Sequence, residues 1–298
     1  MNPIKKLYKY LTNWRWEIGF LDNTLEGVIK GEALRVNWVQ LPFKDRWFAD
    51  PFILDVTENE IIVLGEEFSD KISRGRLGKM VIDRETYKLK SWKVILDLPT
   101  HLSFPAVIRK EGKIYLYPEN SASGKLTIYE YNQQTDELKS LHILSDEPLT
   151  DAIYTEAFDG RKILFSTQIP ESNTNILDIH KWDEKLKRFV KIDKIVAEEK
   201  TGRMAGDIFE VNGKIYRPAQ ESNHEYGHAV EIQEIVYQNG KWSVIPVRRM
   251  ESPHPILKLG FHTFNNYQGM IVIDVKGFRY PIFGKILKSI SANVKGLL

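Results

Sequence analysis

Five ionisable residues recur along the chain at similar intervals, each near the start of a short segment rich in β-forming residues. They are Asp50, His101, Asp151, Arg203 and His262, and successive members lie 50 to 59 residues apart. A carboxylate can take a proton from a hydroxyl as a general base, and a guanidinium can bind phosphate or carboxylate through two parallel hydrogen bonds. Residues so distant in sequence act together only where a repeating fold brings them to one place.

A second set of polar residues stands near the ends of the segments that follow. The set comprises Glu66 and Glu67, Glu119, Gln168, Gln220 with Glu221, and Asp274. Because side chains alternate along a strand, only one of each adjacent pair can face the channel. Arg217 lies three residues before Gln220, so an ideal strand points the two side chains in opposite directions, although Pro218 could bend it. Arg203 and Arg217 are suited to hold a phosphate or carboxylate group.

Aromatic residues accompany these polar groups. Trp47 and Tyr226 offer flat apolar faces against which a sugar ring can stack. A single aromatic residue more often belongs to the core, and that alternative stays open for both.

The elements that position these residues form a repeat. Five segments, which begin at Trp47, His101, Thr150, Arg203 and Gly260, each read as two β-rich runs around a tight turn. The turn glycines of the last four copies are spaced 48, 53 and 56 residues apart, and each copy is followed by a further hairpin-like run. Four antiparallel strands in about 50 residues is the size of a propeller blade.

The repeat predicts an all-β fold, a five-bladed β-propeller with short terminal helices, in one domain over residues 1–298. Blades begin near 47, 101, 150, 203 and 260, and residues 14–46 supply a ring-closing strand region. A β-sandwich is the alternative, but it does not explain a four-strand period that recurs five times.

Residues 282–298 form an amphipathic basic tail. One helical face of this tail carries five apolar residues, namely Ile286, Leu287, Ile290, Val294 and Leu297. Such a helix can lie on an anionic membrane surface, or it can dock on the propeller. The sequence therefore predicts either a peripheral membrane contact through the C-terminal helix or an internal packing role.

Composition narrows the class of protein. Among 298 residues, 42 Lys and Arg face 40 Asp and Glu, which argues against a nucleic-acid partner because that function needs a concentrated basic surface. The chain has no cysteine, which excludes disulfide frameworks and thiolate metal sites. No apolar run approaches the roughly 20 residues of a membrane span. We expect a cytoplasmic protein, peripheral on the inner membrane face if the tail binds lipid.

The motifs predict no cofactor and no metal. Gly-rich phosphate loops of the P-loop and Rossmann types do not occur in the sequence. His224 and His228 have the spacing of metal ligands on a helix, but they lie between strand-like runs beside Gly227. A central divalent cation held by carboxylates such as Asp50 and Asp151 is the alternative.

Five motifs in register carry a family resemblance: WFADPF, HLSFP, GKIYLYPE, DGRKILFS and NGKIYRPAQESNHEYG. From about Trp16 to Arg279 the chain resembles the N-terminal domain of plant glucosamine inositolphosphorylceramide transferases and related bacterial proteins. The resemblance implies a five-bladed propeller similar to those of glycoside hydrolase family 43, and a setting in surface-glycan or glycolipid assembly. In the plant proteins a separate C-terminal domain is the recognised glycosyltransferase.

The glycosidase resemblance implies three acidic roles. An Asp in the first blade is the general base, an Asp in the third tunes pKa and position, and a Glu in the fourth is the general acid. Asp50 and Asp151 match the first two, whereas Arg203 stands where the fourth-blade acid is expected. Glu119 is the nearest substitute by motif, but it belongs to the second blade.

Three functions follow from these residues. The preferred one is glycosyl transfer from a phosphate-linked sugar donor to a glycan or glycolipid acceptor, with Asp50 or Asp151 as base and Arg203 and Arg217 on the phosphate. It needs no protonated acid, because phosphate leaves as a stabilised anion. The alternatives are a glycoside hydrolase with Glu119 as acid, and a non-catalytic glycan-binding module that positions a partner transferase.

Overall fold

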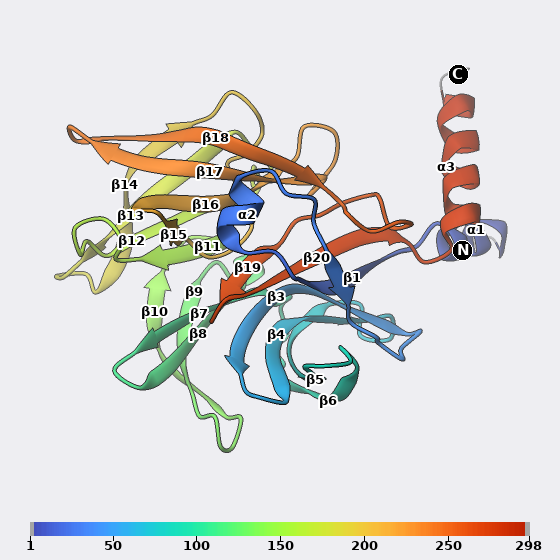
Figure 1. The fold of residues 1–298 in the computed structure, drawn as a ribbon, viewed down its shortest axis with the longest axis horizontal. Helices are drawn as coiled ribbons and strands as arrows, with labels where there is room; N and C mark the ends of the chain where they lie inside the picture. Colours follow the sequence, from blue (N-terminus) through green and yellow to red (C-terminus); the bar gives the residue numbers. More distant parts are fainter. Residues whose placement is uncertain (1–2, 296–298) are drawn as a thin grey trace.

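The chain folds as a ring of five four-stranded antiparallel sheets, as the computed structural model shows for residues 3–295 (Figure 1). The predicted all-β, five-bladed propeller is confirmed. The first blade contains β3 (Arg46–Val56), β4 (Glu60–Ser69), β5 (Gly75–Asp83) and β6 (Leu89–Leu96). The second contains β7 (Ser103–Lys110), β8 (Lys113–Glu119), β9 (Leu126–Tyr131) and β10 (Leu138–Ser145), with a 3-10 turn η1 (Ser121–Ser123).

The next two blades repeat this order. The third contains β11 (Leu149–Thr155), β12 (Ile163–Gln168), β13 (Ile176–Asp183) and β14 (Arg188–Val196). The fourth contains β15 (Phe209–Val211), β16 (Lys214–Glu221), β17 (Ala229–Gln238) and β18 (Lys241–Glu251). Strands β3, β7, β11, β15 and β19 are the innermost, and β3 contacts both β7 and β19.

The last blade closes the ring with strands from both ends of the chain. Its order is β19 (Phe264–Tyr267), β20 (Met270–Phe278), β1 (Trp14–Leu21) and β2 (Val36–Trp38). Strands β1 and β20 pair in register from Trp14↔Phe278 to Leu21↔Ile271. Between β1 and β2 lies a short helix, α2 (Leu25–Ile29), which the sequence analysis did not predict; the Thr24 hydroxyl caps it by accepting from the Gly27 N–H.

Tight turns join the two inner strands of several blades. In the second, fourth and fifth blades both turn residues have positive φ, with values of 52° and 73° at Glu111 and Gly112. The same pair of values recurs within a few degrees at Asn212 and Gly213. A two-residue type I′ turn requires this backbone, and its second position favours glycine, which explains why the repeat is visible as spaced glycines.

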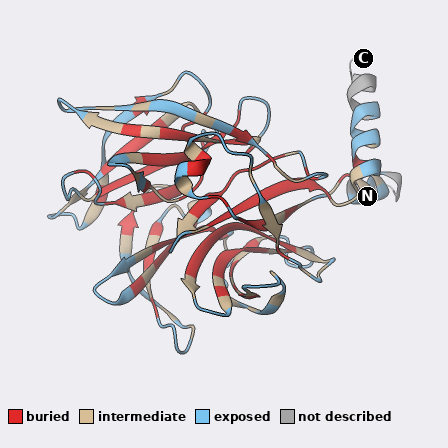
Figure 2. Ribbon diagram, viewed as in Figure 1, coloured by how far each residue is buried: buried red, intermediate tan, exposed pale blue. Residues whose placement is uncertain are grey.

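The inner and middle strands form the core because each sheet packs against a neighbouring sheet on both faces. Strand β20 is buried along nearly its whole length, whereas the outer strand β18 alternates between exposed and half-buried residues. Figure 2 shows this gradient from buried inner strands to exposed outer edges. The buried centre of the ring is therefore where polar groups need partners of their own.

Two helices stand beside the ring, α1 (Pro3–Leu11) and α3 (Pro281–Lys295) (Figure 1). They are joined to the propeller through β1 and β20, and the Arg279 N–H donates to the Asn13 carbonyl at 2.8 Å. Residues 296–298 of the predicted tail, including Leu297, lie outside the described residues. Across residues 3–295, no helix has the length and apolar character that crossing a bilayer requires.

Candidate active site in the propeller channel

A bulge recurs near the start of the innermost strand in three consecutive blades. Its residues are Asp50, Phe104 and Asp151, with φ of 51°, 41° and 44°. The pairing register of each strand with its neighbour shifts at this position. Bulges re-aim side chains, and non-glycine residues hold positive φ only where their surroundings enforce it. The second-blade counterpart of the two aspartates is thus Phe104, not His101.

The bulge N–H groups tie the blades together through buried carboxylates. The Asp50 N–H donates to Asp274 Oδ2 at 2.9 Å, and the Phe104 N–H donates to Asp50 Oδ2 at 3.0 Å. The Asp151 N–H donates to Glu119 Oε2 at 3.0 Å. Each carboxylate therefore bonds to the next blade around the ring, which gathers Asp50, Glu119, Asp151 and Asp274 at one end of the channel. We call this end, where the innermost strands begin, the channel mouth.

Arg203 lies between two of these carboxyl groups. Its Nε donates to Asp151 Oδ2 at 2.5 Å, and its Nη2 lies 3.4 Å from Glu119 Oε2. Burial alone would lower the pKa of Arg203, but Asp151 and Glu119 raise it well above the usual value. Burial and the nearby Asp151 raise the pKa of Glu119 to about 8, against the opposing effect of Arg203. The guanidinium therefore forms its ion pair with the closer Asp151, and Glu119 is protonated at neutral pH.

Asp50 faces His262 on the other side of the channel. The His262 ring lies between two carboxylates, with Nδ1 at 2.8 Å from Asp274 Oδ1 and Nε2 at 3.4 Å from Asp50 Oδ1. The Trp16 ring stacks on it at a centroid distance of 3.7 Å. Although burial would lower the pKa of His262, Asp274 and Asp50 raise it. Burial raises the pKa of Asp50 to about 6, so Asp50 is ionised at neutral pH.

Two buried oxygens near the centre have no hydrogen-bond partner in the described structure. They are Glu66 Oε1, which lies 3.2 Å from His101 Nε2 without hydrogen-bond geometry, and Gln220 Oε1. The Gln220 Nε2 donates to Asp151 Oδ2 at 2.5 Å and to the Met204 carbonyl at 2.9 Å. Unpaired buried acceptors cost free energy, and a ligand hydroxyl is a donor that satisfies them.

Aromatic side chains line the channel mouth around a buried lysine. Trp47 stacks on Phe68 with ring centroids 4.7 Å apart. Lys276 Nζ donates to the Tyr226 carbonyl at 3.1 Å and lies 5.5 Å from the Trp16 ring and 5.7 Å from the Tyr226 ring. Burial lowers the pKa of Lys276. A cation among aromatic faces suits a sugar that carries an anionic group.

Two predicted binding residues occupy other positions. Arg217 is fully buried on the opposite side of β16, where its guanidinium bonds to Gln233 Oε1 at 2.9 and 2.7 Å and to the Gly202 carbonyl at 3.1 Å. It lies outside the channel cluster, because strand alternation directs it away from Gln220. His101 is partly exposed and accepts from the Gly75 N–H at 2.9 Å, so it reaches the mouth only through Glu66.

The structure brings together most of the remaining predicted residues, and it adds others. Asp50, Glu119, Asp151, Arg203, Gln220, Tyr226 and His262 contact one another directly or through one neighbour, with Trp47 at the rim. Glu66 and Asp274 belong to the second set of polar residues predicted from the sequence, whereas Lys276 and Trp16 are not singled out there. The alternation of side chains along a strand could have predicted Lys276, because it lies two residues after Asp274 and so shares its face.

One group of residues in the described chain has the geometry of a metal site, namely Asp50, His262 and Asp274. A protonated imidazole has no free lone pair, so this group could hold a divalent cation only after His262 loses its proton. The raised pKa of His262 opposes that loss. A divalent cation at this position would therefore compete with a proton for the His262 imidazole.

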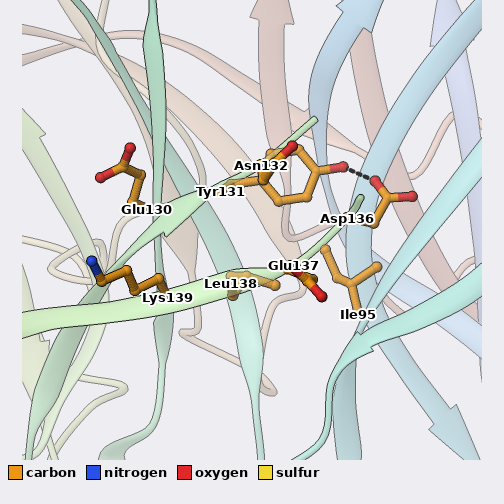
Figure 3. A pocket seen from close by; sticks show the side chains of 8 residues that line it. All are labelled: Ile95, Glu130, Tyr131, Asn132, Asp136, Glu137, Leu138 and Lys139. Carbon is orange, nitrogen blue, oxygen red and sulfur yellow. Dashed lines mark hydrogen bonds between the residues drawn. The ribbon is translucent and has the colours of Figure 1, made fainter. Parts of the chain in front are cut away.

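A surface hollow of about 790 Å³ lies elsewhere, between the β9–β10 hairpin and Ile95 (Figure 3). Of its three acidic residues, Asp136 bonds to the Tyr131 hydroxyl and pairs with Lys79 at 2.6 Å, Glu130 pairs with Lys113 at 3.0 Å, and Glu137 is exposed. The hollow therefore lacks the cluster of buried ionisable groups found at the channel mouth, which is the better candidate site.

Several solved structures that align with this chain are glycoside hydrolases. A thermostable family-43 glycoside hydrolase aligns over 82% of this chain and 90% of its own, with a TM-score of 0.54 and 12% identity. The β-xylosidase RS223 covers 78% and 92%, with a TM-score of 0.53 and 12% identity. A GH43_1 enzyme from Xanthomonas citri covers 78% and 87%, with a TM-score of 0.51 and 10% identity. At such identities the likeness concerns the fold alone.

Sequence comparison is more specific. The profile of the family described as "Glucosamine inositolphosphorylceramide transferase 1, N-terminal" matches residues 36–252. Two curated relatives named glucosamine inositolphosphorylceramide transferase 1, from Oryza sativa subspecies indica and japonica, are 27% identical over 207 residues. The alignment covers 65% of this chain and 27% of each rice protein, so the chain spans about a quarter of their length. The chain therefore belongs to the family of glucosamine inositolphosphorylceramide transferase N-terminal domains.

Proposed function

We propose that this chain transfers a glycosyl group from a phosphate-linked sugar to a glycan or glycolipid acceptor, with Asp50 as the general base. The observation that carries the proposal is the placement of Asp50, a buried carboxylate that the first-blade bulge holds at the channel mouth beside His262. Burial raises the pKa of Asp50 to about 6, which leaves it ionised at neutral pH. A base with a pKa near the working pH is well matched to proton abstraction. Asp50 Oδ1 accepts from the Thr263 hydroxyl and faces His262 Nε2 at 3.4 Å, whereas Oδ2 accepts only from the Phe104 N–H and so retains a lone pair for the acceptor hydroxyl.

In the proposed step Asp50 accepts the proton of the acceptor hydroxyl as that oxygen forms a bond to the anomeric carbon. The bond between the anomeric carbon and the phosphate oxygen breaks, and the phosphate leaves with the electron pair. Arg203 is already ion-paired with Asp151, and Arg217 lies outside the channel cluster. We therefore assign the phosphate contact to Lys276 rather than to these two arginines. The half-buried Tyr226 would contact the sugar ring, with Trp47 packed behind the site against Phe68, and Glu66 and Gln220 would accept the sugar hydroxyls.

Family membership supports the setting of this proposal. The rice relatives are named glucosamine inositolphosphorylceramide transferase 1, a name that joins a sugar to a lipid. Since the chain matches only about a quarter of those proteins, their activity is carried to it here as part of the proposal. A glycolipid acceptor would also require access to a lipid surface.

Glu119 favours a second candidate, hydrolysis of a glycoside. A carboxyl group with a pKa raised to about 8 is protonated at neutral pH and can protonate a leaving sugar oxygen. With Asp50 as base, Glu119 would supply the acid that the fourth blade lacks. The two candidates thus share Asp50 and differ in their need for Glu119.

Substitution Glu119→Gln distinguishes the two reactions. If the chain transfers from a phosphate-linked donor, we expect the rate of transfer to change by less than about tenfold, because phosphate departure needs no acid. If it hydrolyses glycosides, release of free sugar falls by about 10²–10⁴-fold. The measurement is product analysis with phosphate-linked sugars and with oligosaccharides. Glu137→Gln, on the exposed β9–β10 hairpin, is the matched control, and loss of transfer in Glu119→Gln alone would contradict the preferred reaction.

A further inference from the structure

Both terminal helices leave the propeller at the channel mouth. Strand β1 begins, and β20 ends, at the edge where the innermost strands begin, and Trp14 pairs there with Phe278. Helix α1 ends three residues before Trp14, and α3 begins three residues after Phe278. The Tyr10 and Tyr280 hydroxyls are hydrogen-bonded, with ring centroids 5.2 Å apart. Figure 1 shows the two helices together on one side of the ring.

Helix α3 exposes an apolar face. Ile282 is 72% exposed, and Phe283, Ile286 and Ile290 are each more than half exposed. On an ideal helix these four residues fall within one third of the circumference. Gly284 lies on a different side, against the Phe278 ring. The exposed length of α3 is visible in Figure 2.

The apolar face is continued by α1 and by the rim of the mouth. Leu7 and Tyr10 are more than half exposed on α1, and Trp14 is 44% exposed where β1 begins. The centroid of the Trp14 ring lies 5.8 Å from that of Trp47, a buried residue beside the channel mouth, so the exposed apolar surface ends at Trp14, next to the site. The surface is therefore contiguous with the channel mouth.

The charged side chains of the two helices are all positive. Their sequences, PIKKLYKYL and PIFGKILKSISANVK, contain six lysines and no acidic residue. Lys285 and Lys288 are exposed on α3. In a symmetric pair of chains that met through this surface, lysines would face lysines, which is destabilising. Phosphate headgroups of anionic lipids would instead neutralise them.

We infer that α1 and α3 form a lipid-binding surface that seats the channel mouth on an anionic bilayer. The apolar residues of α3 enter the boundary between headgroups and acyl chains, and the lysines contact the phosphates. Two signals, an apolar face and a basic one, are what stable peripheral binding requires. The identity of the acceptor rests on the proposed function. If that function holds, the acceptor that enters the channel mouth is a lipid-anchored glycan presented from the bilayer.

Vesicle co-sedimentation of the full chain tests the inference. The vesicles contain phosphatidylcholine alone, or phosphatidylcholine with about one third phosphatidylglycerol, which supplies the anionic surface. We expect binding to the anionic vesicles only. The pair Lys285→Glu and Lys288→Glu should weaken it roughly 25-fold or more, since each lysine near an anionic surface contributes about fivefold. The pair Ile286→Ser and Ile290→Ser should also abolish sedimentation.

Matched controls lie on the outer strand β18, where Ile245 is 51% exposed, like Ile286 at 52%. Ile245→Ser with Val247→Ser should bind vesicles as the wild type does, and unchanged circular dichroism verifies the fold of every variant. Equal sedimentation with both vesicle types, or no effect of either α3 pair, would overturn the inference. So would a dimer in sedimentation velocity that Ile286→Ser with Ile290→Ser dissociates, because a second chain would then cover the surface. Vesicle binding is read without any substrate, so its outcome is independent of catalysis.

Discussion

The substitution Asp50→Asn should reduce glycosyl transfer by about 10²–10⁴-fold, the usual contribution of a positioned general base. The amide retains an oxygen that can accept the Phe104 N–H, which now donates to Asp50 Oδ2 at 3.0 Å, but it cannot take a proton from the acceptor. The change in shape is small, so the loss should appear in the catalytic rate. The measurement is the initial rate of transfer with the donor and acceptor that the protein binds.

The pH dependence of wild-type transfer is a second test of Asp50 as the general base. Burial raises the pKa of Asp50 to about 6, and only the ionised form acts as a base. The rate should therefore be maximal above pH 6 and fall tenfold per pH unit well below it. In Asp50→Asn the residual rate of transfer should no longer fall as the pH is lowered below 6.

Asp55→Asn is the control for Asp50→Asn, because Asp55 lies on the same strand but away from the mouth, beside the Val56 N–H. It should retain wild-type transfer. If Asp50→Asn and Asp55→Asn transferred at equal rates, Asp50 would serve only to join the first two blades, and the proposed base would be wrong.

Replacing Arg203 by methionine should destabilise the protein by about 3–5 kcal/mol, the cost of leaving a buried carboxylate without its partner. The Arg203 Nε lies 2.5 Å from Asp151 Oδ2, and Asp151 is only 2% exposed. Glu119 would lose its cationic neighbour as well. The free energy of unfolding, measured by urea denaturation at pH 7, should show the loss directly.

A double substitution separates the ion pair from simple packing. Asp151→Asn added to Arg203→Met removes the unpaired charge, so it should recover part of the lost stability. Arg74→Met is the comparison at the surface, where the pair with Asp97 is partly exposed and worth about 0–1 kcal/mol. A loss below about 1 kcal/mol in Arg203→Met would mean that the buried pair contributes no more than a surface ion pair, which would contradict this prediction.

The architecture was predictable because its signals are local and periodic. Type I′ turns place glycine at the second turn position, and Gly112, Gly213 and Gly269 therefore mark the same point of three blades. The short helix α2 carries a local signal too, the capping Thr24, but it is five residues long and interrupts no strand. The repeat of strands and the turn residues can be read directly from one sequence, and they are enough to predict the five-bladed ring.

The site was predictable only in part, since it depends on register at the bulges. Alternation correctly separates Arg217 from Gln220, yet it cannot decide between Glu66 and Glu67. In the structure Glu67 turns away to pair with Arg76 at 2.8 Å, while Glu66 lies with the channel carboxylates. The bulge also places Phe104, not His101, opposite Asp50. Nothing in the local sequence marks where a strand gains its extra residue.

The central claim is that the channel mouth binds a phosphate-linked sugar, and thermal unfolding of the purified chain tests it most directly. The panel contains sugar nucleotides, free nucleoside diphosphates, a polyisoprenyl-phosphate sugar and free oligosaccharides. A ligand at 100 times its dissociation constant adds about 2.7 kcal/mol to the stability of the folded state and raises the melting temperature. We predict that phosphate-linked sugars stabilise the wild type and that Lys276→Met removes the effect. Stabilisation by free oligosaccharides alone, unchanged in Lys276→Met, would contradict the claim and point to hydrolysis or to glycan binding without transfer.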